Sequence, residues 1–259
     1  MHNAYRTDLA YIHDAGFGEF ARSAAAFLME RLTLGGIQDG TVVDLGCGSG
    51  ITARLLCDAG FDVVGIDASE AMIEIARARV PEADFRVGSW ATAVMPPCVA
   101  VAAIGEVLSY IGSDDASGFP NRDSQDRARS SNARAELLGR IHAALAPGGV
   151  LLLDMAGPDG APSSGPRRTF TEGPDWAVLA ESEADDTRSL LTRRITTFRR
   201  VGESYRRDSE VHRLELVDPA DVLKSLRDAG FSAQVLDRYG PQVRLPGLAG
   251  FLAEKAPDE

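Results

Sequence analysis

The sequence predicts an α/β fold: a doubly wound, mostly parallel seven-stranded sheet with an N-terminal helical cap and an antiparallel β insertion after strand five. Three observations lead to it. Apolar runs of strand length alternate with helical stretches as far as Met155, a glycine-rich turn follows the first run, and the later part of the chain becomes rich in Thr, Val, Ile and Arg. Alternation of this kind indicates βαβ units, whose helices cover both faces of a parallel sheet.

The parallel part is expected to contain short buried strands with helices between them. The predicted strands are Thr41–Leu45, Asp62–Ile66, Ala83–Val87, Val99–Ile104 and Val150–Met155. The predicted helices are Ile51–Ala59, Ser69–Arg79 and Ala133–Ala146, and two more around Asn3–His13 and Phe17–Leu32 form a cap within residues 1–36. Ser69 followed by Glu70 suits a helix start, because a hydroxyl can cap the first amides and an acid favours that end.

The remaining elements close the core and form the insertion. A loop is predicted over Gly157–Arg168, and three antiparallel strands over Trp176–Val217. A helix over Ala220–Ala229, ended by Gly230, precedes the last two strands, Phe231–Arg238 and Leu248–Lys255. The expected core therefore comprises residues 37–156 and 218–259, and residues 157–217 are expected to cover a cleft.

Charge and cysteine content narrow the class of protein. With 27 basic and 38 acidic residues the net charge is −11, so phosphate-rich nucleic acid is not an expected partner. No run of about 20 apolar residues predicts a membrane span, and no signal peptide is visible at the start. Three cysteines without C-x-x-C spacing predict neither a disulfide framework nor a metal site, so a reducing cytoplasm is expected.

The glycine-rich turn is the main functional signal. VVDLGCGSG (Val42–Gly50) places three glycines at the end of a predicted strand, where bare backbone can meet a ligand. A dinucleotide site would need G-x-G-x-x-G, but the third required position is Ile51. The observed pattern is G-x-G-x-G with Asp44 two residues before it, so an oxidoreductase using a nicotinamide cofactor is disfavoured.

Four landmarks in order resemble the class I S-adenosylmethionine-dependent methyltransferases of the small-molecule type. They are VVDLGCGSG, VVGIDASEAMIEIAR (Val63–Arg77), LAPGGVLLLD (Leu145–Asp154) and the closing LRDAGF (Leu226–Phe231). The resemblance implies a Rossmann-like methyltransferase fold, S-adenosylmethionine as cofactor and S-adenosylhomocysteine as product.

The resemblance also implies which residues bind the cofactor. Gly46, Gly48 and Gly50 would pass beside its methionine portion, Asp44 would engage its amino group, and Asp67 would accept hydrogen bonds from the ribose hydroxyls. Ala68 and Met72 would pack on the adenine, with Ser89 and Trp90 nearby where many members of the family carry an aspartate. Cys47, inside the motif, and Gly105, after the fourth strand, complete the predicted set.

Structural alternatives remain open for several of these residues. Gly48 or Gly50 could serve close helix packing, Asp44 and Asp67 could be helix caps or surface carboxylates, and Trp90 could belong to the core.

Candidate catalytic residues come from the insertion and the fourth strand. Tyr205–Val217 has period two, which places Glu210 and His212 on the same inward face as Leu214 and Leu216. An inward Glu-x-His pair is a candidate acid/base set, because histidine titrates near neutrality; a pair that only braces the insertion is the alternative. Glu106, at the end of the fourth strand, is a further candidate.

Candidate substrate contacts are Tyr11, His13, Tyr110 and Arg194. Between Thr187 and Arg213 there are eight arginines and three acids, so an acidic group on the substrate is one possibility and solvation of a sheet edge the other. Residues 112–132, almost without apolar side chains, are a candidate lid or a surface insertion without a role.

The expected function is transfer of a methyl group to a nitrogen or oxygen of a small polar metabolite, by a monomer or homodimer. The alternatives are a non-catalytic cofactor-binding protein, or an enzyme of this fold that uses the cofactor for other chemistry.

Overall fold

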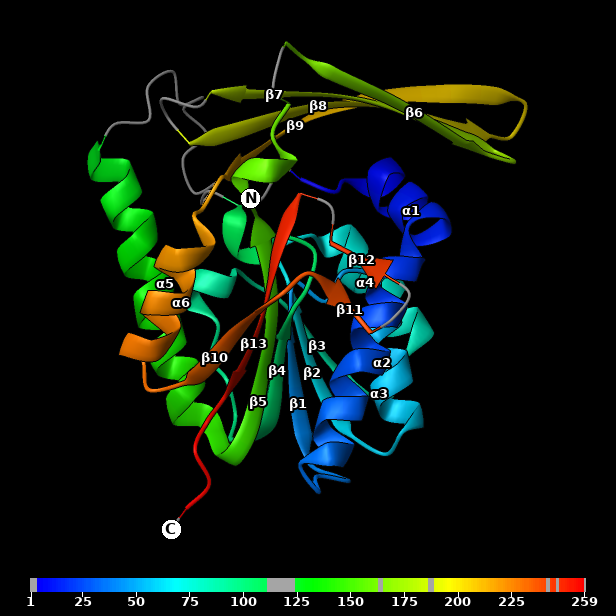
Figure 1. Ribbon diagram of the computed structural model, residues 1–259. Helices are drawn as coiled ribbons and strands as arrows, with labels where there is room; N and C mark the ends of the chain where they lie inside the picture. The colour runs from blue at the N-terminus through cyan, green and yellow to red at the C-terminus, as the bar shows by residue number, and fades with distance from the viewer. Residues whose placement is uncertain are drawn as a thin grey trace.

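The molecule contains the predicted seven-stranded, mostly parallel sheet, whose strands follow the order β10-β13-β5-β4-β1-β2-β3 (Figure 1). The computed structural model describes residues 4–110, 124–162, 165–185, 189–240, 243–245 and 247–258. The strands are β1 (Thr41–Leu45), β2 (Asp62–Asp67), β3 (Asp84–Val87), β4 (Cys98–Ala103), β5 (Leu145–Ala156), β10 (Ser232–Leu236) and β13 (Leu248–Glu254). Only β13 runs against its neighbours, pairing antiparallel with both β5 and β10.

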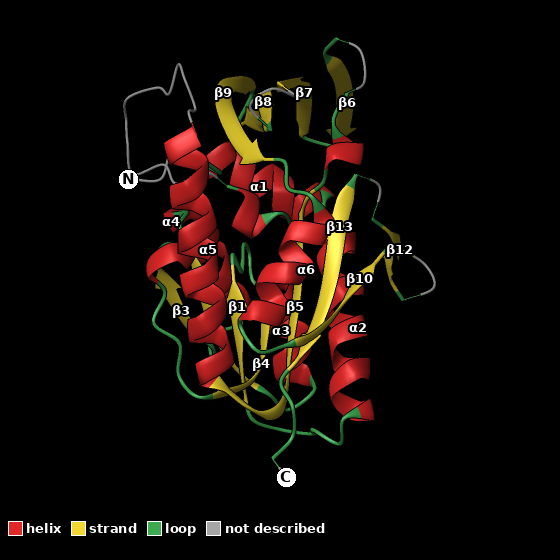
Figure 2. Ribbon diagram, turned by 60° about the vertical axis from the view of Figure 1, so that its left-hand side comes forward, coloured by secondary structure: helices red, strands yellow, loops and turns green. Residues whose placement is uncertain are grey.

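Helices cover both faces of this sheet (Figure 2). On one face lie α2 (Gly18–Leu34), α3 (Ile51–Asp58) and α4 (Glu70–Arg79), whose apolar side chains, among them Leu28, Leu56 and Ile73, form one buried cluster with strand residues such as Val42 and Leu152. The other face is covered by α5 (Ser124–Ala144) and α6 (Pro219–Asp228). Successive side chains of a strand point to opposite faces, so each central strand contributes to two apolar layers.

The insertion is a separate antiparallel sheet of four strands, which lies across the end of the parallel sheet (Figure 1). Its strands are β6 (Arg167–Gly173), β7 (Trp176–Asp185), β8 (Leu190–Val201) and β9 (Ser204–Glu215). Three strands were predicted, and the missing one, β6, begins inside the predicted loop. It escaped detection because it is an edge strand whose side chains are almost all exposed, so it shows no apolar alternation.

Helix α1 (Thr7–Gly16) joins the insertion to the rest of the molecule. The buried carboxylate of Asp8 accepts two hydrogen bonds of 2.5 Å from the guanidinium of Arg206, and Arg199 approaches it at 3.5 Å. Tyr11 donates a 2.8 Å hydrogen bond to Asp175, and its ring lies under the Arg199 guanidinium at 3.6 Å. Residues more than 160 positions apart therefore hold the insertion over the cleft.

Two further differences from the prediction concern helix length and small elements. Helix α5 begins at Ser124, nine residues before the predicted start at Ala133, because its first turns are polar and give no apolar stripe. Of the candidate lid, residues 112–123 lie outside the described residues, and residues 124–132 are the first turns of α5 rather than a loop. A two-stranded sheet, β11 (Arg238–Tyr239) and β12 (Val243–Arg244), was not foreseen.

Among the described helices, none is long and apolar enough to cross a membrane.

Candidate functional site

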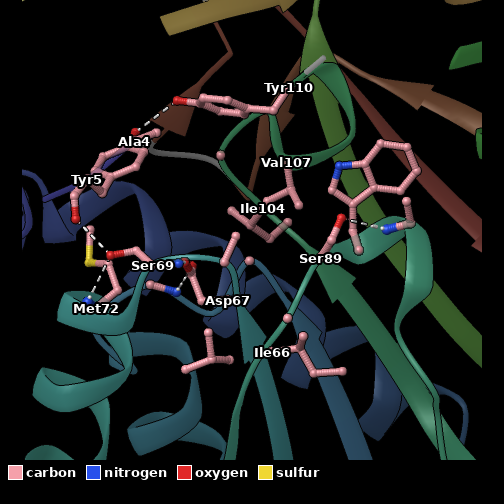
Figure 3. Close-up of a pocket in the computed structure, with 18 of the residues that line it drawn as sticks. Ala4, Tyr5, Ile66, Asp67, Ser69, Met72, Ser89, Ile104, Val107 and Tyr110 are labelled. Carbon is pink, nitrogen blue, oxygen red and sulfur yellow. Dashed lines mark hydrogen bonds between the residues drawn. The ribbon is translucent and has the colours of Figure 1, made fainter. Parts of the chain in front are cut away.

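A cavity of about 340 Å³ opens where β1, β2, β3 and β4 end, beneath the insertion (Figure 3). Ligands of doubly wound sheets bind at this edge, where strand order reverses. Ten of the predicted site residues line the cavity: Gly46, Gly48, Asp67, Ala68, Met72, Ser89, Trp90, Gly105, His13 and Tyr110. The glycine turn and the ends of three further strands therefore converge on one space.

Asp67, the last residue of β2, is held by backbone amides. Its two carboxylate oxygens accept hydrogen bonds from the N–H groups of Gly48 at 2.9 Å and Ser69 at 2.8 Å. Burial raises the pKa of Asp67, and the hydrogen bonds from the backbone of Ser69, Gly48 and Ala68 oppose that rise. Each oxygen keeps further acceptor capacity, so the carboxylate is fixed and able to accept two hydroxyl groups from a ligand.

Ser69 is a lining residue that the sequence suggested only as a helix cap. Its Oγ accepts a 3.2 Å hydrogen bond from the N–H of Met72, which caps α4, and donates a 2.7 Å hydrogen bond to the carbonyl of Tyr5. One hydroxyl therefore fixes both the helix start and the N-terminal segment that closes the cavity.

Two glycines of the motif line the cavity and the third does not. Gly46 has φ +69° and leaves no room for a Cβ, which would overlap the side chain of Val107. Gly48 also lines the cavity, and the nearest side-chain atom to its Cβ position, in Met72, is 4.0 Å away. Gly50 instead begins α3 with φ +77°, and a Cβ there would lie 3.1 Å from the Cβ of Ala76. The packing alternative describes Gly50, which we place outside the cavity lining.

Asp44 and Cys47 also lie outside the cavity lining. Asp44 is 2% exposed, and its Oδ2 has no hydrogen-bond partner within the described part of the chain. Burial, with the nearby charge of Asp67 as a smaller cause, raises the pKa of Asp44 to about 8. A buried carboxyl oxygen without a partner fits a cationic ligand group, such as the amino group of the cofactor that the resemblance implies. Cys47 is a buried thiol whose pKa burial raises well above its usual value, so it fills space as a neutral side chain.

The far end of the cavity is formed by the residues after β3. Ser89 accepts a 3.2 Å hydrogen bond from the N–H of Ala91 and begins the short 3-10 helix η1 (Trp90–Thr92). Trp90 lines the cavity and also packs against the core beneath α5, so the core alternative and a contact with a ligand are compatible at this position. Arg140 of α5 donates hydrogen bonds to the carbonyls of Ala91 and Ala93, which fixes this wall.

Glu210 and His212 share the buried, inward face of β9, as the period of two predicted, but neither lines the cavity. Nε2 of His212 lies 2.9 Å from the carboxylate of Glu210, and Nδ1 lies 3.2 Å from the hydroxyl of Tyr110. The Tyr110 hydroxyl in turn lies 3.2 Å from that of Tyr5. Both tyrosines line the cavity, where Figure 3 shows the hydrogen bond between their hydroxyls, so a hydrogen-bonded chain connects the buried pair to the cavity.

The N-terminal segment that carries Tyr5 is bound to β9. The N–H groups of Tyr5 and Arg6 donate to the Glu210 carboxylate at 2.6 and 2.9 Å, and the Arg6 guanidinium contacts Asp208. Tyr5 has φ +55°, which is unusual for a residue with a Cβ, and burial raises the pKa of its hydroxyl. No local pattern in the sequence indicates Tyr5, because its hydrogen-bond partners Ser69, Tyr110 and Glu210 lie 64 to 205 residues away.

Glu106 and Arg194, two predicted site residues, do not line the cavity. Glu106 is buried and forms a bidentate ion pair with Arg193, one of whose hydrogen bonds measures 2.8 Å. Arg194 lies on the opposite face of β8, where its half-exposed side chain pairs with Glu183. The alternation within each arginine doublet is confirmed, but Arg193, rather than Arg194, faces inward.

Of the two predicted contacts in α1, only one reaches the cavity. His13 lines it, stacks on Phe17 and meets the edge of Tyr5, and burial lowers the pKa of His13 to about 4. At neutral pH it is therefore an uncharged donor and acceptor. Tyr11 points to the insertion instead, where it contacts Asp175 and Arg199.

Known methyltransferases resemble this chain in sequence and in fold. The profile of the family described as "Methyltransferase domain" matches residues 17–232. Trans-aconitate 2-methyltransferase from Delftia acidovorans is 34% identical over 136 residues, which are 51% of this chain and 42% of that protein. The chain thus spans about half the length of the curated relatives it matches.

Solved structures share the fold at low identity. A S-adenosylmethionine-dependent methyltransferase from Clostridium acetobutylicum superposes with a TM-score of 0.77 at 17% identity, covering 95% of this chain and 97% of that one. CalS10 from Micromonospora echinaspora, an amino pentose methyltransferase with bound S-adenosylmethionine, gives 0.73 at 17% identity, covering 99% and 100%.

We predict that Gly50→Ala destabilises the protein more than Gly36→Ala does. The two glycines have nearly equal φ, +77° and +76°, but a Cβ at Gly36 meets nothing within 4 Å. Urea denaturation should show a loss of about 1 kcal/mol for Gly36→Ala, from conformation alone. Gly50→Ala should cost about 2–3 kcal/mol, because its Cβ also crowds Ala76. Equal losses would contradict a packing role for Gly50.

We predict that binding of S-adenosylmethionine releases close to one proton at pH 7. Asp44, with its pKa of about 8, is mostly protonated in the free protein, and a cationic partner favours its ionised form. Calorimetry in buffers of different ionisation enthalpy measures this release. It should become small at pH 9, and affinity should rise as the pH increases towards 8. Asp44→Asn should bind more weakly and release no proton; release that persists in this variant would assign it to another group.

Proposed function

Because this chain belongs to the methyltransferase-domain family of S-adenosylmethionine-dependent enzymes, we propose that it methylates a nitrogen or oxygen atom of a small polar metabolite. The observation that carries the proposal is a single cavity in which the Asp67 carboxylate and two tyrosine hydroxyls meet. One of these hydroxyls is hydrogen-bonded to a buried histidine.

The residues around the glycine turn suit the cofactor. Asp67 would hold its ribose hydroxyls, Gly46 and Gly48 would let its methionine portion approach the backbone, and Asp44 would balance its amino group. When bound, the cofactor supplies a methyl group whose carbon is already electrophilic, because it is attached to a positively charged sulfur. The chief task left to the protein is to orient the acceptor and exclude water, which can lower a barrier by several kcal/mol, up to about 10.

The hydrogen-bonded chain from Tyr5 to Glu210 can remove a proton from the acceptor. With Nε2–H of His212 donating to Glu210, Nδ1 is left to accept a proton from the Tyr110 hydroxyl. Tyr110 would be replenished from Tyr5 or from an acceptor hydroxyl or amine in the cavity. The Glu210 carboxylate stabilises the imidazolium that results. The proposed base is therefore His212, acting through tyrosine rather than by contact with the acceptor.

The charged residues around the cavity favour an acceptor whose reacting end is uncharged. The described lining residues include no Lys or Arg, and the inward guanidinium of Arg193 is paired with Glu106. The Delftia acidovorans relative is named for trans-aconitate, an acidic metabolite. An acidic group in this cavity would have to compete with Glu106 for Arg193, so we favour a neutral hydroxyl or amine for the acceptor.

We predict that S-adenosylmethionine and S-adenosylhomocysteine bind with micromolar affinity and that NADH does not bind. Asp67→Ala should abolish binding of both, because its carboxylate also positions Gly48 and Ser69. The matched control is Asp62→Ala, an exposed carboxylate at the start of the same strand. Titration calorimetry checks all three proteins; NADH binding to the wild type, or cofactor binding by Asp67→Ala, would contradict the assignment.

We predict that His212→Ala and Tyr110→Phe each lower kcat about 10²-fold while leaving cofactor affinity nearly unchanged. The measurement is turnover across a screen of small amines and alcohols, followed from pH 6 to pH 9. Tyr11→Phe is the control, because it removes a tyrosine hydroxyl whose partner lies away from the cavity. Turnover by His212→Ala that matches the wild type at every pH would show that His212 is not the base.

A further inference from the structure

The turn after β4 is held from behind by a buried carboxylate. Asp154, on the adjacent strand β5, is 0% exposed and accepts hydrogen bonds from the N–H groups of Gly105 at 3.0 Å and Glu106 at 2.6 Å. Both residues of the turn have positive φ, +92° and +62°. Successive amides in such a turn can point to one anion, and here the chain supplies that anion itself.

The Gly105–Glu106 turn determines which residues form one wall of the cavity. Gly105, Val107 and Tyr110 line the cavity, whereas Glu106 points to Arg193. The left-handed conformation of Glu106 is unfavourable for a residue with a Cβ, so it needs support from its surroundings. The amide hydrogen bond to Asp154 supplies that support.

Two further contacts make the end of β5 the anchor of the whole segment. The Tyr239 hydroxyl donates a 2.8 Å hydrogen bond to Asp154, and its ring packs against Phe20 and Phe27 of α2. The N–H of Ala156 donates a 2.8 Å hydrogen bond to Oγ of Ser109. Residues 105–110 are thus fixed to β5 at both of their ends.

We propose that Asp154 is a positioning residue for methyl transfer, which holds the Gly105–Glu106 turn so that the Tyr110 hydroxyl and the wall formed by Val107 meet the acceptor. The inference rests on the proposed function, and it assigns a role to a residue that does not touch the cavity. Burial raises the pKa of Asp154 to about 6, and its hydrogen bonds with the Glu106 and Gly105 amides and with Tyr239 oppose that rise. The group is therefore mostly ionised at neutral pH, which leaves both of its oxygens free to accept the hydrogen bonds from the two amides and from Tyr239.

The test compares Asp154→Asn and Tyr239→Phe with the wild type, and uses Asp62→Asn, an exposed carboxylate on β2, as the matched control. Asp154→Asn should lower kcat/KM for the acceptor at least tenfold, through kcat more than KM. Its Kd for S-adenosylhomocysteine should stay within threefold, because Asp67 and the backbone of the glycine turn keep their contacts on β1 and β2, and of the predicted cofactor-binding residues only Gly105 is held by Asp154. Tyr239→Phe keeps the Asp154 carboxylate and should lower kcat/KM about threefold, again through kcat more than KM.

Amide hydrogen exchange gives a second readout that does not need an acceptor. Exchange at Gly105 and Glu106 should be faster in Asp154→Asn, and faster to a smaller degree in Tyr239→Phe, while the amides of β1 keep their wild-type protection. If Asp154→Asn does not fold, Tyr239→Phe provides the same two measurements.

The outcomes separate this proposal from the proposed function. A folded Asp154→Asn with wild-type turnover, or with unchanged exchange at Gly105 and Glu106, overturns the positioning role and leaves methyl transfer intact. A parallel loss of turnover and of cofactor affinity would show a merely structural residue. Wild-type protein that binds S-adenosylhomocysteine but methylates nothing in the screen counts against the proposed function, and the exchange result then decides alone whether Asp154 holds the turn.

Discussion

The shape of the cleft depends on the hydrogen bonds that the Glu210 carboxylate accepts. It is 4% exposed, and a buried charge is costly unless hydrogen bonds replace its water. The amides of Tyr5 and Arg6 supply two of those bonds, and Nε2 of His212 lies within hydrogen-bond distance. The N-terminal segment is thereby attached to β9, and Tyr5 becomes part of the cavity wall. One side chain thus both closes the cleft and sets the orientation of the histidine behind it.

Other carboxylates near the cleft also accept hydrogen bonds from backbone amides, with the exception of Asp44. Asp67 and Asp154 each accept hydrogen bonds from two backbone amides, and in doing so they fix the turns after β1 and β4. Asp44 is 2% exposed, but one of its oxygens has no partner among the described residues. The satisfied carboxylates therefore shape the site, whereas the unsatisfied one is suited to a charge that arrives with a ligand.

One arginine of each doublet in the insertion faces inward and pairs with a buried carboxylate. Arg199 and Arg206 neutralise the buried Asp8 of α1, and Arg193 neutralises Glu106. Each of these pairs joins segments that are remote in sequence, so the local positive charge holds the insertion sheet against an otherwise acidic molecule. This use of the arginines explains why the cavity beneath them gains no free cation from the described part of β8.

The sequence by itself determined the alternation of strands and helices in the parallel core, the glycine turn, the position of Asp67 and the shared face of Glu210 and His212. Each of these follows from a local period or from neighbouring residues in one motif. Tertiary structure alone decided that Gly50 packs on Ala76, and that Tyr5 lines the cavity. It also decided which member of an arginine doublet faces inward, and that tyrosine separates His212 from the cavity. These outcomes depend on partners 26 to about 205 residues away. A local sequence pattern does not indicate which distant residues will pack against it.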